Sequence, residues 1–297
     1  MRLLVLGASG LLGSNVVVEA QNRGHTVTGT YNSTGIENPG KAIEFDLREL
    51  GAISRILDRT EPEAVLNCAA LTDVDACEAD PDRAQRVNAD APSEIADDCS
   101  ERGIEFVQTS TDYVFSGEAR SPYLETEDTE PIQVYGQTKR DGERSVLAAH
   151  EDALVVRTSA NFGIHRETDS LQGFPAWVSD RFEAGEETPL FTDQYFTPSE
   201  TGWAAARILD LLSAGATGLY HVTSRSCTNL WYFGHLIADR CGFQDPDDVF
   251  LPASRSTLDR PASRPEYSCL GTERVDSAAG EHRPAIGDLL ENVSGYL

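Results

Sequence analysis

The stretch "RLLVLGASGLLGSN" at residues 2–15 decides how the rest of the chain is interpreted. An apolar run ends directly in glycines, and a pattern of helical periodicity follows without a gap. The run predicts a buried strand over 2–7, and the pattern predicts a helix from Leu11 to Asn22. A strand that passes through glycines into a helix is the first unit of a dinucleotide-binding domain.

The glycines of this stretch occur at positions 7, 10 and 13. We expect Gly7 to permit the tight turn, Gly10 to let the backbone approach a phosphate, and Gly13 to let the helix pack on the strand. The N–H groups and positive dipole of the helix N-terminus favour a pyrophosphate there. The predicted cofactor residues of this loop are Gly7, Ser9, Gly10, Leu11, Leu12 and Gly13. The spacing G-x-x-G-x-x-G is typical of extended short-chain dehydrogenases.

Strands and helices alternate through the first half of the chain. Further strands are predicted at 26–31, 42–46, 64–70, 104–110 and 154–159. Helices are predicted near 49–58, from the cap Asp80 toward Gly103, and around 134–143. This alternation predicts right-handed crossovers and an α/β fold with a doubly wound parallel (Rossmann) sheet.

After about residue 160 the alternation becomes irregular. The remaining predicted elements are helices near 171–184, 198–213 and 229–241, strands at 188–191 and 218–222, and a terminal helix. We expect residues 1–160 to form the NAD(P)-binding domain and residues 161–297 mainly a smaller substrate-binding lobe over the carboxyl ends of the strands. Segments at about 188–213 are expected to return to the first domain.

The chain is strongly acidic, with 49 acidic residues against 24 basic ones and a formal charge of −25. The acidic residues are spread along the chain, so a disordered acidic tail is not expected. Such a field disfavours nucleic acid and anionic membranes as partners, and concentrated salt screens its self-repulsion. Because the chain contains only two lysines, Lys41 and Lys139, the composition indicates a halophilic source.

Other sequence signals concern the compartment and metal binding. No apolar run approaches the ~18 residues of a membrane span, and the N-terminus lacks the pattern of a signal peptide. The six cysteines show no C-x-x-C pair and no regular spacing, which predicts free thiols in a reducing cytoplasm. No group of residues has metal-ligand spacing, so no metal site is expected.

The ends of the second and third predicted strands bear on the choice of cofactor. An acidic residue at the end of the second would favour NAD, because it binds the adenine ribose hydroxyls. Residues 30–33, "TYNS", contain no acid, which favours NADPH and leaves NADH as the alternative. Tyr31 and Asn32 are therefore predicted cofactor contacts. Asp46 and Leu47 are placed to meet the adenine, unless Asp46 only caps the following helix.

The fourth and fifth predicted strands end in small and hydroxyl-bearing residues. In "NCAALT" (67–72) the side chains let a cofactor lie against the backbone, although tight packing explains them equally well. In "QTSTDYVFSG" (108–117) a run of hydroxyls ends the strand where the nicotinamide is expected. The predicted cofactor contacts here are Ala69, Ala70, Thr72 and Thr109. Thr111 is placed to donate a hydrogen bond to a substrate carbonyl, and Ser110 is the alternative donor. We expect one of the two only to cap the turn.

The segment "VYGQTKRDGE" at 134–143 carries Tyr135 and Lys139 one helical turn apart, and therefore on one face of a helix. A free tyrosine has a pKa of about 10, too high for efficient proton transfer at neutral pH. A nearby lysine cation is expected to stabilise the phenolate and lower that pKa. The same lysine is placed to bind the nicotinamide ribose. Together with Thr111, these two residues form the predicted catalytic set.

These motifs, with "RTSANFG", "TDQYFTPS", "GLYHV" and "RPEYSCLGTERV", resemble the dTDP-4-dehydrorhamnose reductase family of extended short-chain dehydrogenases. The resemblance runs in order over nearly the whole chain. It implies reduction of a 4-keto nucleotide sugar by NAD(P)H, the last step to dTDP-L-rhamnose. It also implies catalysis by Thr111, Tyr135 and Lys139. The predicted substrate contacts are Thr111, Asp112, Tyr113, Asn161 and Arg264, although Tyr113 equally fits a core position and Arg264 a plain surface arginine.

One departure concerns the aromatic platform for the sugar nucleotide. The bacterial family usually has tryptophan after R-T-S, and this chain has Ala160, so Phe162 is a candidate to supply the ring. Two alternatives remain open: a nucleotide-sugar epimerase, or a non-catalytic NADP-binding accessory protein resembling the β subunit of methionine adenosyltransferase. Thr111 is followed by Asp112 and Tyr113 rather than by Asp and Glu, which argues against a dehydratase. A homodimer is a further expectation.

Overall fold

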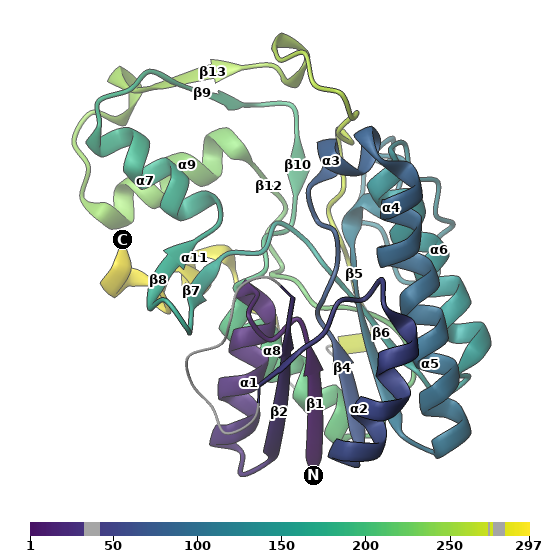
Figure 1. The fold of residues 1–297 in the computed structure, drawn as a ribbon. Coiled ribbons are helices and arrows are strands. Elements are labelled where there is room, and N and C mark those ends of the chain that lie inside the picture. The colour runs from purple at the N-terminus through teal and green to yellow at the C-terminus, as the bar shows by residue number, and fades with distance from the viewer. Residues whose placement is uncertain (33–41, 273, 276–282) are drawn as a thin grey trace.

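The computed structural model describes residues 1–32, 42–272, 274–275 and 283–297. Ser33, from the predicted cofactor-selecting segment, and Lys41 lie outside these described residues. Within them, seven strands form one parallel sheet in the order β11-β6-β5-β4-β1-β2-β3 (Figure 1). The strands are β1 Arg2–Leu6, β2 Thr26–Tyr31, β3 Ala42–Glu44, β4 Ala64–Asn67, β5 Glu105–Thr111, β6 Leu154–Thr158 and β11 Gly218–His221. The predicted doubly wound α/β fold is confirmed.

Helices cover both faces of this sheet. On one face α1 (Leu11–Asn22) and α8 (Thr201–Ser213) share an apolar core with the strands. On the other face the core includes residues of α2 (Ile53–Thr60), α5 (Ala91–Arg102) and α6 (Val134–Ala149). The central strands are buried along nearly their whole length, which is the pattern of a parallel sheet covered on both sides. None of the described helices is both long and apolar enough to cross a membrane.

The helix predicted from Asp80 toward Gly103 is interrupted. Asp80 caps α4 (Pro81–Gln85) as expected, accepting a hydrogen bond from the Arg83 N–H at 3.1 Å. A π-helical turn, Arg86–Asp90, then separates α4 from α5. Pro92 lacks the N–H that would bond four residues back, so the regular hydrogen-bond ladder cannot continue here. α3 (Val74–Ala79) precedes these elements and follows β4.

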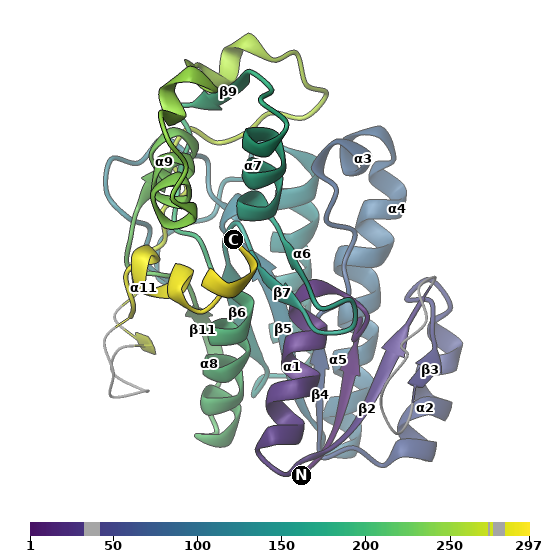
Figure 2. The same cartoon turned by 90° about the vertical axis from the view of Figure 1, so that its left-hand side faces the viewer.

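A smaller lobe lies over the carboxyl ends of the strands (Figure 2). Its core joins α7 (Phe174–Glu183), α9 (Leu230–Cys241) and α11 (Ile286–Glu291). Three two-stranded sheets complete it: β7 Gly163–His165 with β8 Ser170–Gln172, β9 Thr188–Phe191 with β13 Phe250–Ala253, and β10 Tyr195–Phe196 with β12 Thr228–Asn229.

The segment expected to return to the first domain divides between the two parts. α8 packs on the central sheet, whereas β9 stays in the lobe because it pairs with β13. Beyond that segment, β11 joins the central sheet beside β6, so the predicted strand "GLYHV" is an edge strand of the sheet and not part of the lobe.

The expectation of six free thiols is wrong. Cys227 and Cys269 form a disulfide with a Cα–Cα distance of 5.5 Å. The two cysteines are 42 residues apart, and only the fold brings the segment before β12 beside the segment that follows β13. Cys68, Cys77, Cys99 and Cys241 are free.

Replacing Cys227 by serine is expected to lower the free energy of unfolding by about 2–4 kcal/mol, because the bridge restricts the unfolded chain. Denaturant unfolding without reductant measures this loss. Cys241→Ser, which removes a free thiol, is the matched control, and a reductant added to the native chain should reproduce the loss. Equal stability of the native chain, oxidised and reduced, would contradict this role of the disulfide.

Candidate active site

A cavity of about 750 Å³ opens at the carboxyl ends of the strands, under the lobe. The sheet reverses its strand order between β1 and β4, and ligands of open α/β sheets bind at such a reversal. Residues from the ends of β1 to β6 line the cavity, together with residues of α6 and of the lobe. All the predicted site residues except Arg264 and Phe162 are among them.

The glycine loop has the shape that a phosphate site requires. Gly7 has a φ of 73°, which favours glycine, and a Cβ at Gly13 would overlap the Gly7 carbonyl oxygen. The N-cap of α1, Gly10, makes no side-chain capping bond, and the first turn of the helix has no acidic residue. The first N–H groups of α1 therefore face the cavity with no side-chain acceptor, which fits a pyrophosphate.

The ends of β2 and β3 form one end of the cavity. Tyr31, Asn32, Asp46 and Leu47, the predicted cofactor contacts of these strands, line it. The Arg48 Nε bonds the Asp46 carboxylate at 2.9 Å, and this pairing holds the pKa of Asp46 below its ordinary value. Asp46 also accepts a hydrogen bond from the Arg48 N–H at 2.9 Å. Asp46 thus both lines the cavity and caps a turn, so the two readings of this residue are compatible.

The segment after β4 approaches the glycine loop closely. A Cβ at Gly7 would lie 2.8 Å from the Cα of Ala69, so both positions need small residues. Ala69, Ala70 and Thr72 line the cavity. Asn88, in the π-helical turn, holds this segment: it accepts a hydrogen bond from the Leu71 N–H at 2.9 Å and donates one to the Leu71 carbonyl at 3.0 Å.

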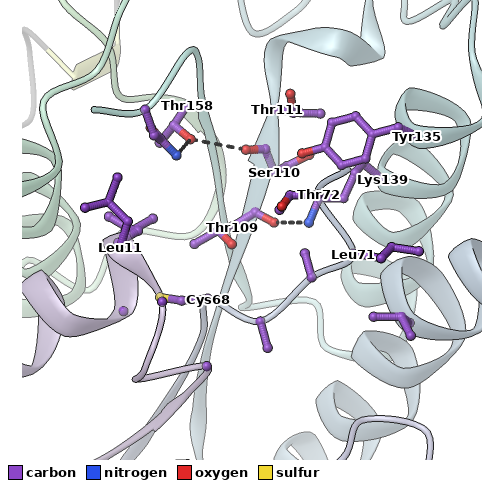
Figure 3. Close-up of a pocket in the computed structure, with 18 of the residues that line it drawn as sticks. Leu11, Cys68, Leu71, Thr72, Thr109, Ser110, Thr111, Tyr135, Lys139 and Thr158 are labelled. Carbon is purple, nitrogen blue, oxygen red and sulfur yellow. Dashed lines mark hydrogen bonds between the residues drawn. The ribbon is translucent and has the colours of Figure 1, made fainter. Parts of the chain in front are cut away.

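Lys139 is buried in the cavity wall, with 3% of its surface exposed. Its ammonium donates a hydrogen bond of 2.7 Å to the Thr109 carbonyl (Figure 3). Burial lowers the pKa of Lys139 to about 8, against the raising influence of the Glu143 carboxylate. The Glu143 carboxylate is itself paired with Arg157, at 2.7 Å and 2.8 Å. The structure therefore places a compact ammonium group beside β5, with a pKa that burial has lowered toward neutral pH.

Tyr135 and Thr111 lie at the same end of the cavity as Lys139 (Figure 3). Burial raises the pKa of Tyr135, and a hydrogen bond with Thr111 opposes that shift. The net direction is opposite to the expected lowering by Lys139, because desolvation of the phenolate outweighs the other influences. A raised pKa keeps the phenol protonated at neutral pH, which is the form that a proton donor needs.

The two candidate hydroxyls of β5 differ in their partners. Thr111 Oγ1 donates to Asp112 Oδ1 at 3.1 Å and accepts from the Tyr113 N–H at 3.2 Å, so Thr111 caps the turn as well as lining the cavity. Ser110 Oγ is buried and has no hydrogen-bond partner among the described residues. A ligand oxygen in the cavity would complete the hydrogen bonding of Ser110.

Asp112 is a buried carboxyl group in the cavity wall, with 3% of its surface exposed. Ser268 Oγ donates to it at 2.5 Å. Burial raises the pKa of Asp112 to about 6, although hydroxyl groups of Ser268, Ser159 and Thr111 oppose the shift. Burial also raises the pKa of the neighbouring Tyr113 to about 12, and the Tyr113 hydroxyl accepts from Gln194 Nε2 at 3.2 Å.

The raised pKa of Asp112 predicts a pH-dependent contribution to stability. Folding favours the protonated form, so the contribution is present below the ordinary pKa of 3.8 and is lost as the pH rises through about 6. Asp112→Asn cannot ionise. Between about pH 4 and pH 7 the variant should therefore gain roughly 3 kcal/mol of unfolding free energy relative to the native chain. Denaturant unfolding across this range measures the difference, and a constant difference would contradict the assignment.

The lobe closes the cavity with apolar and amide side chains. Asn161 lines it and donates to Thr158 Oγ1 at 3.1 Å. The lobe-side set is Ala160, Asn161, Phe174, Gln194, Phe196 and Leu230. Phe162 is wrong as the aromatic platform, because it is fully buried in the core of the lobe.

Arg264, like Phe162, is a predicted substrate contact that lies outside the cavity lining. Its guanidinium bonds the Asp75 carboxylate at 3.0 Å and 3.1 Å, and the Ala262 carbonyl at 2.8 Å. The pair holds the C-terminal segment against α3. Its role as a diphosphate contact is therefore not supported.

Several lining residues have no motif in the sequence that marks them. Arg83 comes from α4 and Phe174 from the start of α7, whereas Gln194 stands in the quoted stretch "TDQYFTPS" without a predicted role. Arg48, which follows Asp46 and Leu47, is likewise a lining residue that no motif marks. Among the described residues, no group of three or more His, Cys, Asp or Glu is placed to hold a metal ion.

A dinucleotide cradle at one end of the cavity and an aligned tyrosine, lysine and threonine at the other define an NAD(P)-dependent oxidoreductase of the short-chain type. The family model described as the RmlD substrate binding domain matches residues 1–294. The chain belongs to this family.

Relatives of known name match over nearly the whole chain. A probable low-salt glycan biosynthesis reductase, Agl14, of Haloferax volcanii is 40% identical over 97% of this chain and 95% of its own length. A dTDP-4-dehydrorhamnose reductase of Streptomyces griseus is 36% identical over 94% of this chain and 88% of its own. The crystal structure of a dTDP-4-dehydrorhamnose reductase of Clostridium acetobutylicum has a TM-score of 0.87 at 28% identity, covering 98% of this chain and 97% of that one. The similarity thus includes the sheet domain and the lobe.

Proposed function

We propose that this protein reduces the ketone of a 4-keto nucleotide sugar with NADPH, most closely dTDP-4-dehydrorhamnose to dTDP-rhamnose. The observation that carries the proposal is the convergence of Tyr135, Thr111 and Lys139 on one end of a cavity that also contains a phosphate-binding helix terminus. The relatives support the choice of substrate, since dTDP-4-dehydrorhamnose reductases match the chain over most of its length.

The chain's own residues would hold the ketone and supply the proton. A bound nicotinamide cofactor supplies the hydride. Tyr135 donates its phenolic proton to the carbonyl oxygen, so that the ketone becomes a secondary alcohol. The Ser110 hydroxyl, which has no partner among the described residues, would donate to the same oxygen. Thr111 would join it by turning its single hydroxyl proton from Asp112 to the ketone, and Lys139 would stabilise the phenolate left on Tyr135.

The same positions define the proposed binding residues. The cofactor would be held by the residues that line the cavity from the glycine loop to β5: Gly7, Ser9, Gly10, Leu11, Leu12, Gly13, Tyr31, Asn32, Asp46, Leu47, Ala69, Ala70, Thr72 and Thr109. Tyr135 and Lys139 would also touch it. Asp112, Tyr113 and Asn161 would contact the sugar nucleotide. A cytoplasmic location, a homodimeric assembly and a halophilic source for this protein stay predictions.

A direct assay tests the function. The purified protein, in concentrated salt, is given NADPH and a panel of 4-keto nucleotide sugars, and the absorbance of the reduced nicotinamide is followed. We expect loss of absorbance with a 6-deoxy-4-keto sugar nucleotide. Interconversion of two sugars without net loss of NADPH would indicate the epimerase. Tight NADPH binding with no turnover of any sugar would indicate the accessory protein.

A further inference from the structure

Two arginines lie at the end of the cavity formed by β2 and β3. Arg48 follows β3, and Arg83 comes from α4, which the fold brings to the same place. Both are exposed, both line the cavity, and both act on the carboxylate of Asp46. The chain segments that supply them are far apart in sequence, so their meeting at one rim is a property of the fold.

The charge at this rim is unusual for so acidic a chain. Arg48 is paired with Asp46, but the Arg83 guanidinium has no hydrogen bond or ion pair in the part of the chain that the structure describes. Arg83 is nevertheless near enough to Asp46 to add to the effect of Arg48 in lowering the pKa of that carboxylate. In a chain with 49 acidic residues, an arginine at a cavity rim whose guanidinium makes no ion pair is available to bind an anionic ligand.

The position of the rim identifies the kind of anion. The pyrophosphate site is the N-terminus of α1, and the redox end is at β5 and α6, so the β2–β3 end is where an adenosine ribose would lie. Tyr31 and Asn32, which line the end of β2, carry no charge that would repel a phosphate. A guanidinium group binds a phosphate through two parallel, charge-assisted hydrogen bonds. A neutral ribose hydroxyl can be bound without a cation, so the arginines favour a phosphate at this end of the cavity.

We propose that Arg83, with Arg48, binds the 2′-phosphate of NADPH and makes the protein prefer NADPH to NADH. The inference rests on the proposed function, since it assumes that a nicotinamide dinucleotide occupies the cavity. With a net charge of −25, the field of the chain opposes a phosphate dianion, so these two cations are needed at the point of contact. Arg48 remains bound to Asp46, so Arg83 is expected to contribute more.

The test is equilibrium binding of NADPH and NADH, followed by the fluorescence of the reduced nicotinamide. The native chain should bind NADPH at least about tenfold more tightly, and Arg83→Ala should raise the Kd for NADPH about ten- to a hundredfold, as for a lost charge-assisted hydrogen bond. The Kd for NADH should stay within about twofold, which also shows that the variant is folded. The double variant with Arg48→Ala should bind both cofactors alike.

Arg86→Ala is the matched control. Arg86 lies three residues after Arg83, outside the cavity lining, and pairs with Asp90 and Glu94. Its replacement should leave both dissociation constants unchanged. Competition by 2′,5′-ADP against 5′-AMP separates a 2′-phosphate from a phosphate of the sugar nucleotide: only 2′,5′-ADP should lose affinity in Arg83→Ala.

The outcomes separate this inference from the proposed function. If the native chain binds NADPH and NADH equally, or if Arg83→Ala weakens both to the same extent, the 2′-phosphate site is wrong and the reductase proposal stands. If the native chain binds neither dinucleotide, both are wrong. Loss of affinity for a nucleotide sugar alone in Arg83→Ala would assign the arginine to the substrate and overturn the inference.

Discussion

Tyr135→Phe is expected to lower kcat by roughly 10²–10⁴-fold, the usual contribution of a positioned proton donor. The phenol lies in the cavity wall beside Thr111, and its raised pKa keeps the proton on the ring until the carbonyl oxygen becomes negative. Phenylalanine keeps the ring, including its edge-on contact with Tyr113 at 6.1 Å between centroids, and removes only the hydroxyl. The variant should therefore fold normally.

Two measurements make this result specific to proton donation. The Kd for NADPH should stay within a few-fold of the native value, because a phenylalanine ring fills the same wall. Tyr232→Phe removes an exposed tyrosine hydroxyl, with 62% of the residue's surface exposed, and should leave kcat unchanged. A near-native kcat in Tyr135→Phe would remove the proton-donor role and transfer it to another group of the cavity.

Lys139→Arg is expected to lower kcat by about 10²-fold, the low end of general acid–base contributions. The lysine is one of two in a chain of 22 arginines, and it occupies a closed position where its ammonium bonds one carbonyl, that of Thr109. A guanidinium is larger, planar and forked, so it cannot reproduce a point contact in this space. Overpacking there should also cost about 1–3 kcal/mol of unfolding free energy.

The reverse exchange on the same helix is the control. Arg140→Lys changes a partly exposed side chain that pairs with Asp141, and it should alter neither kcat nor stability measurably. Full activity in Lys139→Arg would show that any cation suffices at this position. It would also show that the scarcity of lysine elsewhere in the chain has no bearing on the site.

Much of the fold could be predicted because its determinants are local. The buried strands β1, β4 and β6 are short, mainly apolar runs, and the glycines after β1 require the turn that they make. The alternation did not show that "GLYHV" joins the central sheet, because strand pairing across the lobe depends on tertiary contacts. The break at Arg86–Asp90 was missed for a related reason, since helical periodicity continues through it.

The site residues also divide into those that local sequence predicts and those that only tertiary contacts bring to the cavity. Residues in contiguous motifs, from Gly7 to Lys139, were predicted and line one cavity. Arg48, Arg83 and Phe174 come from separate segments that no motif marks, so only the folded chain brings them to the cavity. The motif around Arg264 predicts a substrate contact, but the fold brings the distant Asp75 carboxylate to it instead. The Cys227–Cys269 disulfide also depends on a tertiary approach that spacing does not encode.

Transfer of deuterium tests the central proposal most directly. The protein is incubated with NADPH that carries deuterium on the transferred position of the nicotinamide, and with a 4-keto-6-deoxy nucleotide sugar, and the product is analysed by mass spectrometry. We predict an alcohol that contains one deuterium atom at C4, formed in equal amount to the NADP⁺ produced, and its absence in Tyr135→Phe. A sugar product without deuterium, or no product from a protein that binds NADPH tightly, would contradict the reductase.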